Sequence, residues 1–291
     1  MNERDSFTRH WITENSLEII SGYERGVLTL RGLHYLLVNR GMTNSTLHYK
    51  RVVSAMIKAR RDGIVEYKAF SDHDRAVLGF TSYEETSVED KTEQAENQIL
   101  AWMESYNKNL WENQRYYIEV WVEKKALQGV FQPICRKLDV ALAPCKGYPS
   151  LTFLDNAADR FRDAEDTHES IILYFGDYDP SGEDIPRSIQ ENLTGMGVSV
   201  DVRRILLLEE HVRAWNLTPA PVKIGDSRTA KWNGLGQVEL DAIEPKKLQG
   251  IIEESIMEYQ DTNLFLELMD TEKTEAIEFR KLLKEFVLNI K

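Results

Sequence analysis

The sequence predicts an α/β protein in which a mainly helical N-terminal segment precedes a parallel sheet. Four apolar runs rich in Val, Ile, Leu and aromatic residues recur between residues 116 and 208, and a segment long enough for a helix separates each run from the next. Strands that are apolar throughout are typical of a parallel sheet covered by helices on both faces. The 291 residues, 42% of them hydrophobic, are enough for one large domain or two ordinary ones.

The N-terminal segment, residues 1–82, is predicted to hold two helices and a hairpin. One helix is expected over residues 27–41 and, after a polar turn, a second over residues 47–63, where Gly63 marks the end. Residues 63–75 are expected to form a short hairpin. Helix, turn, basic helix and hairpin is the order of a winged helix-turn-helix. The alternative interpretation is a small helical domain whose basic residues only face solvent.

The second of these helices is predicted to have one buried face and one basic face. Apolar residues at i, i+3, i+4 and i+7 predict the buried face. These residues are Tyr49, Val52, Val53 and Met56. The basic residues off this face are the candidate DNA contacts, namely Lys50, Arg51, Lys58 and Arg61.

The charge distribution supports a nucleic-acid partner although the net charge of the chain is −12. Residues 1–80 carry 12 Lys+Arg against 9 Asp+Glu, whereas the other 211 residues carry 24 against 39. The basic character is therefore confined to the N-terminal segment, and the local distribution matters more for phosphate binding than the total does.

Residues 83–114 are predicted to connect the two parts of the chain. The stretch 81–97 is acidic, lacks core residues and is expected to be a linker. Residues 98–114 are expected to form a helix that braces two domains.

Residues 115–291 are predicted to form the sheet domain with a C-terminal helical extension. Strands are expected at 116–122, 140–144, 170–176 and 198–208, and helices at 124–138, at 150–164 and up to about 193. A further strand is expected at 236–243, and a closing helical segment at 245–290. Ligands of such folds bind beyond the C-terminal ends of the strands.

Three carboxylates follow two of these strand ends. Glu123 comes directly after the first strand, and Asp177 and Asp179 follow the third. Carboxylates that converge on one rim repel each other unless a hard cation is present, and Mg²⁺ favours such a site. Ser181 and Gly182 then open the next helix, where free N–H groups favour an anion such as phosphate.

Two other interpretations of this cluster exist. The acids could be solvated loop residues, which is the common case for a lone Asp-x-Asp. They could also form the nucleophile motif of a haloacid-dehalogenase-type phosphotransferase. That motif requires Thr or Val where this chain has Ser181, and it lies on the first strand rather than the third.

The combination of motifs resembles the Toprim domain of topoisomerases, primases and some nucleases. The stretch "VEKKA" is similar to the "VEK-x-A" of that family, and "GDYDPSG" to its "D-x-DP-x-G". A winged helix followed by Toprim resembles the topoisomerase VI A subunit and the related meiotic double-strand-break transesterase. The resemblance implies that Glu123, Asp177 and Asp179 hold Mg²⁺, and that the chain is a minimal relative of this family.

The same resemblance implies a tyrosine nucleophile on the first helix of the winged helix. The family motif "R-D-I-Y-Y" is matched by Arg31-Gly32-Leu33-His34-Tyr35, so Tyr35 aligns with the nucleophile. Gly32 replaces an acidic residue and His34 replaces an aromatic one. In the family, the tyrosine of one subunit meets the metal of the other, which implies a homodimer.

The helical pattern around Tyr35 is compatible with this role. Leu30, Leu33, Leu36 and Leu37 form an apolar face. Tyr35 and Arg31 fall on the opposite face as i, i+4 neighbours. Arg31 could bind a phosphate and stabilise the charge that develops on it.

The sequence thus predicts a type IIB topoisomerase A-like enzyme that cleaves DNA strands by tyrosine transesterification with Mg²⁺. One alternative is a Toprim nuclease that uses water, and another is a DNA-binding module without catalysis. Because no P-loop is evident, strand passage driven by ATP would need a separate ATPase subunit. The roles of two polar clusters stay open: Lys223, Asp226 and Arg228, and Glu239 and Asp241.

Composition and termini predict a cytoplasmic, nucleoid-associated protein. No stretch of about 18 apolar residues is present, and the N-terminus lacks the apolar core of a signal peptide. Cys135 and Cys145 are the only cysteines and lie outside any C-x-x-C motif, so neither a disulfide framework nor a zinc site is expected.

Overall fold

The computed structural model describes residues 7–25, 27–70, 87–222 and 232–288. Contacts divide the chain into two compact units. The first contains the described residues of 1–75 and 116–258, and the second those of 76–115 and 259–291. The C-terminal helix therefore groups with the segment that precedes the sheet.

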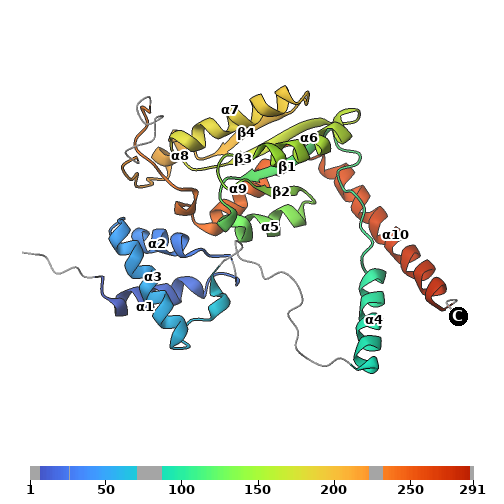
Figure 1. Ribbon diagram of the computed structural model, residues 1–291, viewed down its shortest axis with the longest axis horizontal. Helices are drawn as coiled ribbons and strands as arrows, with labels where there is room; N and C mark the ends of the chain where they lie inside the picture. Colours follow the sequence, from blue (N-terminus) through green and yellow to red (C-terminus); the bar gives the residue numbers. More distant parts are fainter. Residues whose placement is uncertain (1–6, 26, 71–86, 223–231, 289–291) are drawn as a thin grey trace, which may run out of the picture. The chain divides into compact units, whose positions relative to one another are not determined.

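The first unit is built on a four-stranded parallel sheet, which confirms the predicted α/β class (Figure 1). Its strands are β1 (Tyr116–Val122), β2 (Ala141–Pro144), β3 (Glu169–Phe175) and β4 (Asp201–Leu206). They lie in the order β2-β1-β3-β4, and each pair of neighbours is parallel. This order makes β1 and β3 neighbours at the centre of the sheet, so the polar residues that follow them share one edge.

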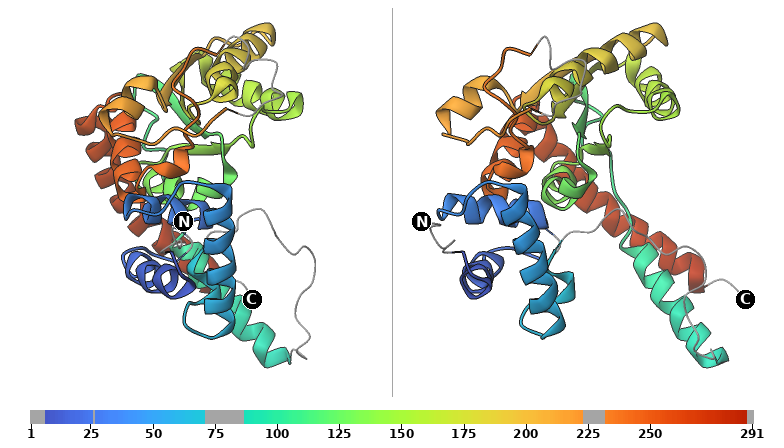
Figure 2. Two further views of the ribbon diagram at one scale, coloured as in Figure 1. Left: turned by 90° about the vertical axis from the view of Figure 1, so that its left-hand side faces the viewer. Right: turned by 60° about the vertical axis from the view of Figure 1, so that its left-hand side comes forward.

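Helices cover both faces of this sheet (Figures 1 and 2). The helices α6 (Leu151–Glu165) and α7 (Pro180–Gly195) lie on one face, and α5 (Gln128–Lys137) and α9 (Pro245–Met257) on the other. Tyr174 belongs to the core under α6 and α7, whereas its neighbour Phe175 packs edge-on against Phe131 of α5, 5.1 Å between ring centroids. Consecutive side chains enter opposite cores, which explains the uninterrupted apolar runs.

The described N-terminal residues of this unit form three α-helices. Their bounds are α1 (Arg9–Ile20), α2 (Leu30–Asn39) and α3 (Thr46–Arg61). The N-cap side chains of Thr8, Thr29 and Ser45 each accept a backbone N–H of the helix that follows. The helices α2 and α3 were expected; α1 was not, because its buried positions are few and include Ser16.

The predicted wing is not formed in the described residues 64–70. They contain a 3₁₀ turn, η1 (Tyr67–Ala69), and Phe70 makes an isolated parallel bridge to Leu28. The remainder of the expected hairpin lies outside the described residues.

The buried face of α3 also differs from the prediction. The residues it buries are His48, Val52, Ala55, Met56 and Ala59. Tyr49 and Val53 are only half-buried and lie at the edges of this face.

Three predictions for other segments were wrong. Residues 88–97, expected to be a linker, form the first part of α4 (Val88–Met103), while the segment from 104 to 114, expected to be helical, is largely irregular. Residues 236–243 do not form a strand. They make isolated antiparallel bridges from Gln237 to Ala220 and from Val238 to Tyr178, followed by η4 (Leu240–Ala242). The first unit also contains two shorter elements, η2 (Lys125–Leu127) and α8 (Glu209–Ala214).

The second unit pairs α4 and the segment after it with α10 (Thr262–Leu288). The Trp111 and Phe265 rings pack edge-on, with 6.4 Å between their centroids. Two ion pairs join the same elements: Lys108 Nζ lies 3.1 Å from a carboxylate oxygen of Glu275, and a guanidinium nitrogen of Arg280 lies 2.5 Å from one of Glu104. Within the described part of the chain, no helix has both the length and the apolar character needed to cross a membrane.

Candidate functional site

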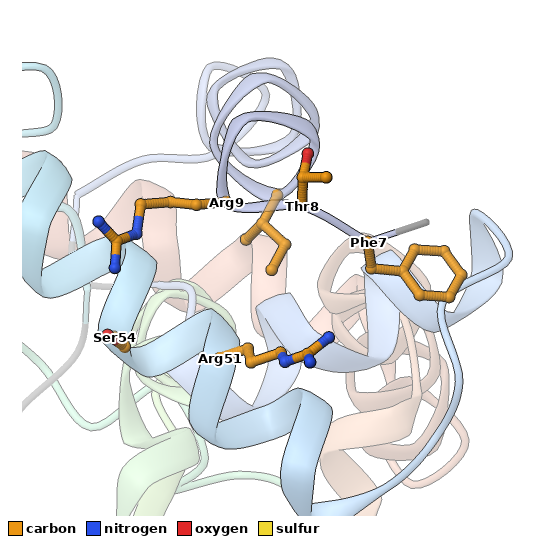
Figure 3. Close-up of a pocket in the computed structure, with 6 residues that line it drawn as sticks. Phe7, Thr8, Arg9, Arg51 and Ser54 are labelled. Atoms are coloured by element: carbon orange, nitrogen blue, oxygen red, sulfur yellow. The ribbon is translucent and has the colours of Figure 1, made fainter. Parts of the chain in front are cut away.

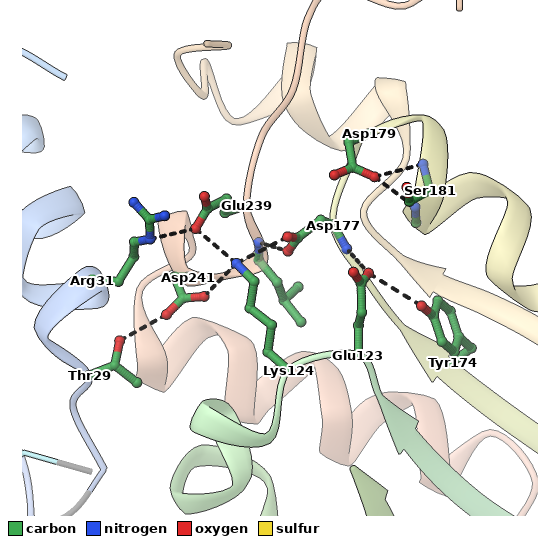
Figure 4. Close-up of polar contacts among 12 residues, drawn as sticks. Thr29, Arg31, Glu123, Lys124, Tyr174, Asp177, Asp179, Ser181, Glu239 and Asp241 are labelled. Carbon is green, nitrogen blue, oxygen red and sulfur yellow. Dashed lines mark hydrogen bonds and ion pairs between the residues drawn. The ribbon is translucent and has the colours of Figure 1, made fainter. Parts of the chain in front are cut away.

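The three predicted carboxylates lie together at the C-terminal ends of β1 and β3 (Figure 4). Glu123 continues the pairing of the two strands, because its N–H donates to the carbonyl oxygen of Phe175. Its Oε2 accepts the N–H of Asp177 at 3.0 Å and the Tyr174 hydroxyl at 3.3 Å. Burial raises the pKa of Glu123; the Asp177 N–H opposes that rise, and the carboxylate of Asp179 adds to it.

Asp177 is the most deeply placed of the three. Its side chain is 9% exposed; Oδ1 accepts the N–H of Leu240 at 2.7 Å and Oδ2 lies 3.0 Å from the Lys124 ammonium. Burial raises the pKa of Asp177 to about 7; Lys124 opposes this rise and Glu123 adds to it. Two carboxylates with raised pKa values side by side are a place where a cation would be stabilised.

Asp179 is half-buried and caps the next helix. Its Oδ1 accepts the N–H groups of Ser181 and Gly182 at 2.9 and 2.7 Å, so α7 begins at Pro180. These N–H groups were expected to bind an anion, and that expectation was wrong because Asp179 already occupies them. A Cβ on Gly182 would lie 2.2 Å from the Asp177 carbonyl oxygen, so only glycine lets α7 approach the strand end this closely.

Lys124 lies among the carboxylates at this end of the sheet. We call these carboxylates the acidic rim: Glu123, Asp177 and Asp179, together with Glu239 and Asp241. Its ammonium lies 3.0 Å from Asp177, 2.9 Å from Glu239 and 3.0 Å from Asp241. Burial disfavours the charge on Lys124, but the three carboxylates outweigh it and raise its pKa well above the usual value. Figure 4 shows the ammonium between these acids, where a cation is required.

Glu239 and Asp241 are site residues whose role the sequence left open. The backbone bonds between Tyr178 and Val238, in both directions, carry them to the rim. The alternation of apolar and acidic residues in "VELDA" was a signal for these two site residues. Nothing in the sequence, however, indicated that this segment pairs with the loop after β3. The other open cluster, Lys223, Asp226 and Arg228, lies outside the described residues.

The N-terminal helices join this rim through the start of α2. The Thr29 hydroxyl donates to Asp241 Oδ1 at 2.8 Å, and Arg31 Nε lies 2.8 Å from Glu239 Oε2. Arg31 therefore lies at the acidic rim, as part of the same polar network as Lys124.

A cavity of about 590 Å³ opens where these elements meet. Glu123, Asp177 and Asp179 line it from the sheet. Arg31 and Tyr49 line it from the N-terminal helices. Tyr35, the predicted nucleophile, is not among the residues that line it.

Tyr35 is half-buried, not held free of the core as predicted. Burial, and secondly the charge of Glu239, raise the pKa of its phenol; the charge of Arg31 opposes them. The adjacent His34 points into the interior, 2% exposed, and neither ring nitrogen has a partner with hydrogen-bond geometry. Burial lowers the pKa of His34 to about 4, opposed by the Asn44 side chain nearby.

The predicted DNA contacts share one face of α3. At about 100° per residue, Lys50, Arg51, Lys58 and Arg61 fall within an arc of about 100°, opposite the buried residues. Lys50, Lys58 and Arg61 are exposed, although Lys58 also pairs with Asp62 at 2.5 Å. Arg51 is half-buried and lines a cavity of about 310 Å³ with Arg9 and Ser54 (Figure 3).

Glu119, in the middle of β1, is a fully buried carboxylate within an otherwise apolar strand, and no motif marks it in the sequence. Arg160 of α6 donates to both of its oxygens, at 2.7 and 3.0 Å. The Tyr117 hydroxyl and the Trp121 indole N–H donate to it as well, both at 2.8 Å.

The donor set at the strand ends is suited to a hard cation. It consists of three carboxylates, and burial and the carboxylate neighbours raise the pKa of two of them, Glu123 and Asp177. With Asp177 drawn to Lys124, no three acidic, His or Cys side chains in the described ranges are close enough together to hold a metal ion as they stand. Because Asp177 already pairs with the Lys124 ammonium, a cation bound here would compete with Lys124 for that carboxylate.

Comparisons of this chain with protein-family models, with curated proteins and with solved structures gave no match.

Proposed function

We propose that this protein cleaves DNA strands by Mg²⁺-assisted transesterification, in the manner of the topoisomerase VI A subunit that its motifs resemble. The observation that carries the proposal is that Glu123, Asp177 and Asp179 follow the ends of two adjacent parallel strands and line one cavity. That is the edge at which ligands of such sheets bind.

In this proposal the acidic residues of the rim bind the metal ion and the basic residues bind the DNA phosphate. Glu123, Asp177 and Asp179 would hold Mg²⁺, which when bound would polarise the phosphodiester and stabilise the leaving oxygen. Arg31 and Lys124 line the same cavity and bring positive charge to a DNA phosphate. A tyrosine from the N-terminal helices would supply the attacking oxygen, and the resemblance assigns this role to Tyr35.

The basic face of α3 is the proposed DNA-contacting surface. Lys50, Arg51, Lys58 and Arg61 would bind backbone phosphates and so place a strand along this helix. The resemblance also implies a homodimer, which would provide one site per DNA strand. A separate ATPase subunit would be needed for strand passage.

A second candidate function is a Toprim nuclease in which water attacks the phosphodiester. The observation that favours it is the position of Tyr35, which is half-buried and does not line the cavity of the carboxylates. Burial also makes its phenolate harder to form.

A covalent protein–DNA adduct separates the two functions. The protein is incubated with supercoiled plasmid and Mg²⁺, the reaction is stopped with detergent, and nicked DNA is analysed with and without protease. Transesterification predicts DNA that carries protein until protease is added, and none of it in EDTA. Nicked DNA free of protein would favour the nuclease, and intact DNA in both conditions would contradict both functions.

A further inference from the structure

Tyr49 is the tyrosine of the N-terminal helices that lines the cavity of the acidic rim. It lies in the first turns of α3, between the N-cap Ser45 and the buried Val52, and its side chain is half-buried. Glu123, Asp177 and Asp179 line the same cavity from the strand ends. One chain therefore brings a phenol and the three carboxylates to a common space.

The ring of Tyr49 is fixed by two neighbours on α2. The guanidinium carbon of Arg31 lies over the ring, 4.8 Å from its centroid, and the His34 ring packs edge-on at 5.7 Å. Arg31 is in turn held by Glu239 at 2.8 Å. In the described part of the chain, the Tyr49 hydroxyl has no hydrogen-bond partner, so it is available to a substrate.

Arg31 also brings a positive charge next to the Tyr49 ring. This charge can pair with the phosphate under attack. The side chain of Arg31 is 42% exposed, so the guanidinium remains accessible to DNA.

On this geometry we propose that Tyr49, not Tyr35, is the nucleophile, and that it acts on the metal site of its own chain. This inference rests on the proposed transesterification. The Tyr49 oxygen forms a bond to phosphorus as the bond from phosphorus to the 3′ oxygen breaks, leaving a 5′-phosphotyrosyl link. The phenolic proton passes to water and the 3′ oxygen takes up a proton, so the step needs no oxidant, reductant or further reactant.

Trypsin distinguishes the two tyrosines without any substitution. Cleavage after Arg31 and Arg40 places Tyr35 in the peptide of residues 32–40, whereas Tyr49 lies in the peptide that begins at Gly41 and ends at Lys50 or Arg51. Each peptide contains a single tyrosine. The full-length protein is trapped on supercoiled plasmid with Mg²⁺, digested with nuclease and trypsin, and the peptide that carries a nucleotide is identified by mass spectrometry.

The expected result is a nucleotide on the peptide that begins at Gly41. Tyr49→Phe, which keeps the ring and its packing, should lose at least about 100-fold in adduct yield, while the matched Tyr35→Phe retains most of it. Circular dichroism and DNA binding should be unchanged in both. A nucleotide on the 32–40 peptide would overturn the assignment but leave transesterification standing. Mg²⁺-dependent cleavage with no adduct, or no cleavage, would overturn the assignment together with the proposed function.

A mixture of variants tests whether the site lies within one chain. Tyr49→Phe and Asp177→Asn proteins are co-expressed with different tags so that any mixed dimers can be purified. A site within one chain predicts that such dimers do not nick plasmid, because each chain lacks one group. Recovery of nicking in the mixed dimers would show that the groups come from different subunits and would overturn the proposed arrangement.

Discussion

Glu119 and Glu123 lie four residues apart, in the middle and just beyond the end of β1, yet their carboxylates have opposite surroundings. Glu119 is fully buried and its oxygens receive bonds from Arg160, Tyr117 and Trp121. Glu123 receives one backbone N–H and one longer hydroxyl contact, and it lies beside Asp177. Removing one partner of a fully paired buried charge destabilises a fold, whereas neighbouring acids with too few donors are stabilised by binding a cation. The difference is the basis for treating Glu119 as a structural carboxylate and for proposing Glu123 as a functional one.

The largest effect should come from replacing the rim carboxylate. Glu123→Gln keeps the size of the side chain but removes the charge, so Mg²⁺-dependent plasmid cleavage should fall by about 100-fold or more. The urea midpoint should not decrease, because burial already disfavours the ionised form of Glu123. Initial nicking rates at fixed Mg²⁺ measure the effect. Full activity in Glu123→Gln would remove this residue from the site.

The matched change at Glu119, in the middle of β1, should lower the stability of the protein and leave DNA cleavage unchanged. Glu119→Gln replaces one acceptor oxygen by an amide group that cannot accept, leaving a donor of Arg160 or Trp121 without a partner. We expect a loss of about 2 kcal/mol in the free energy of unfolding, since the Arg160 side chain can still reach water. Urea denaturation measures it, and cleavage per folded molecule should be unchanged. An unaffected midpoint would mean that the Arg160 pair contributes nothing to stability.

His34 adds a third case, a buried polar side chain without a partner of good geometry. Burial lowers its pKa to about 4, while in the unfolded chain it is near the usual 6.5. Below pH 6.5 the unfolded state takes up a proton that the folded state does not, so stability is lost as the pH falls towards 4. Between pH 7.5 and 4.5 the free energy of unfolding should fall by about 2 kcal/mol for this reason. His34→Phe keeps an aromatic ring and should lose correspondingly less, as urea unfolding at the two pH values would show; an equal loss in both proteins would exclude His34 as the cause.

The basic face of α3 should give the smallest effect. Alanine at Lys50, Arg51, Lys58 and Arg61 should weaken DNA binding by about tenfold and reduce the salt slope by up to about 3.6, since each phosphate contact contributes about 0.9. Lys58 should contribute least because Asp62 already pairs with it. The control replaces four ion-paired arginines elsewhere, Arg162, Arg187, Arg203 and Arg213, for an equal change in charge. Equal slopes in the two variants would mean that DNA does not contact α3.

The sheet could be predicted because its signals are local. β1 was expected at 116–122, where the structure places it, and the strands around Leu142, Leu173 and Arg204 were found within a few residues. The carboxylates could be placed at one rim because parallel strands end at the same edge. By contrast, residues 236–243 alternate like a strand, but their pairing with Tyr178 is limited to one bridge, and local pattern does not reveal that.

The surroundings of the tyrosines could not be predicted, because they depend on contacts far apart in sequence. A helical wheel placed Tyr35 away from the core and Tyr49 in it, whereas both are half-buried. The bonds of Arg31 to Glu239 and of Thr29 to Asp241 span about two hundred residues, and they bring the start of α2 to the rim. Lys124 belongs to the "VEKKA" motif, but its three carboxylate partners lie in segments far along the chain.

Calorimetric titration with Mg²⁺ tests most directly whether the strand-end carboxylates, unlike Glu119, bind a metal ion. Wild-type protein and Glu119→Gln should bind Mg²⁺ with a saturable isotherm at pH 7.5, whereas Glu123→Gln and Asp177→Asn should show no saturable binding under the same conditions. The wild-type isotherm should disappear when the protein is titrated in excess EDTA. Equal binding by all four proteins, or no binding by the wild type, would contradict the assignment of the strand-end carboxylates as a magnesium site.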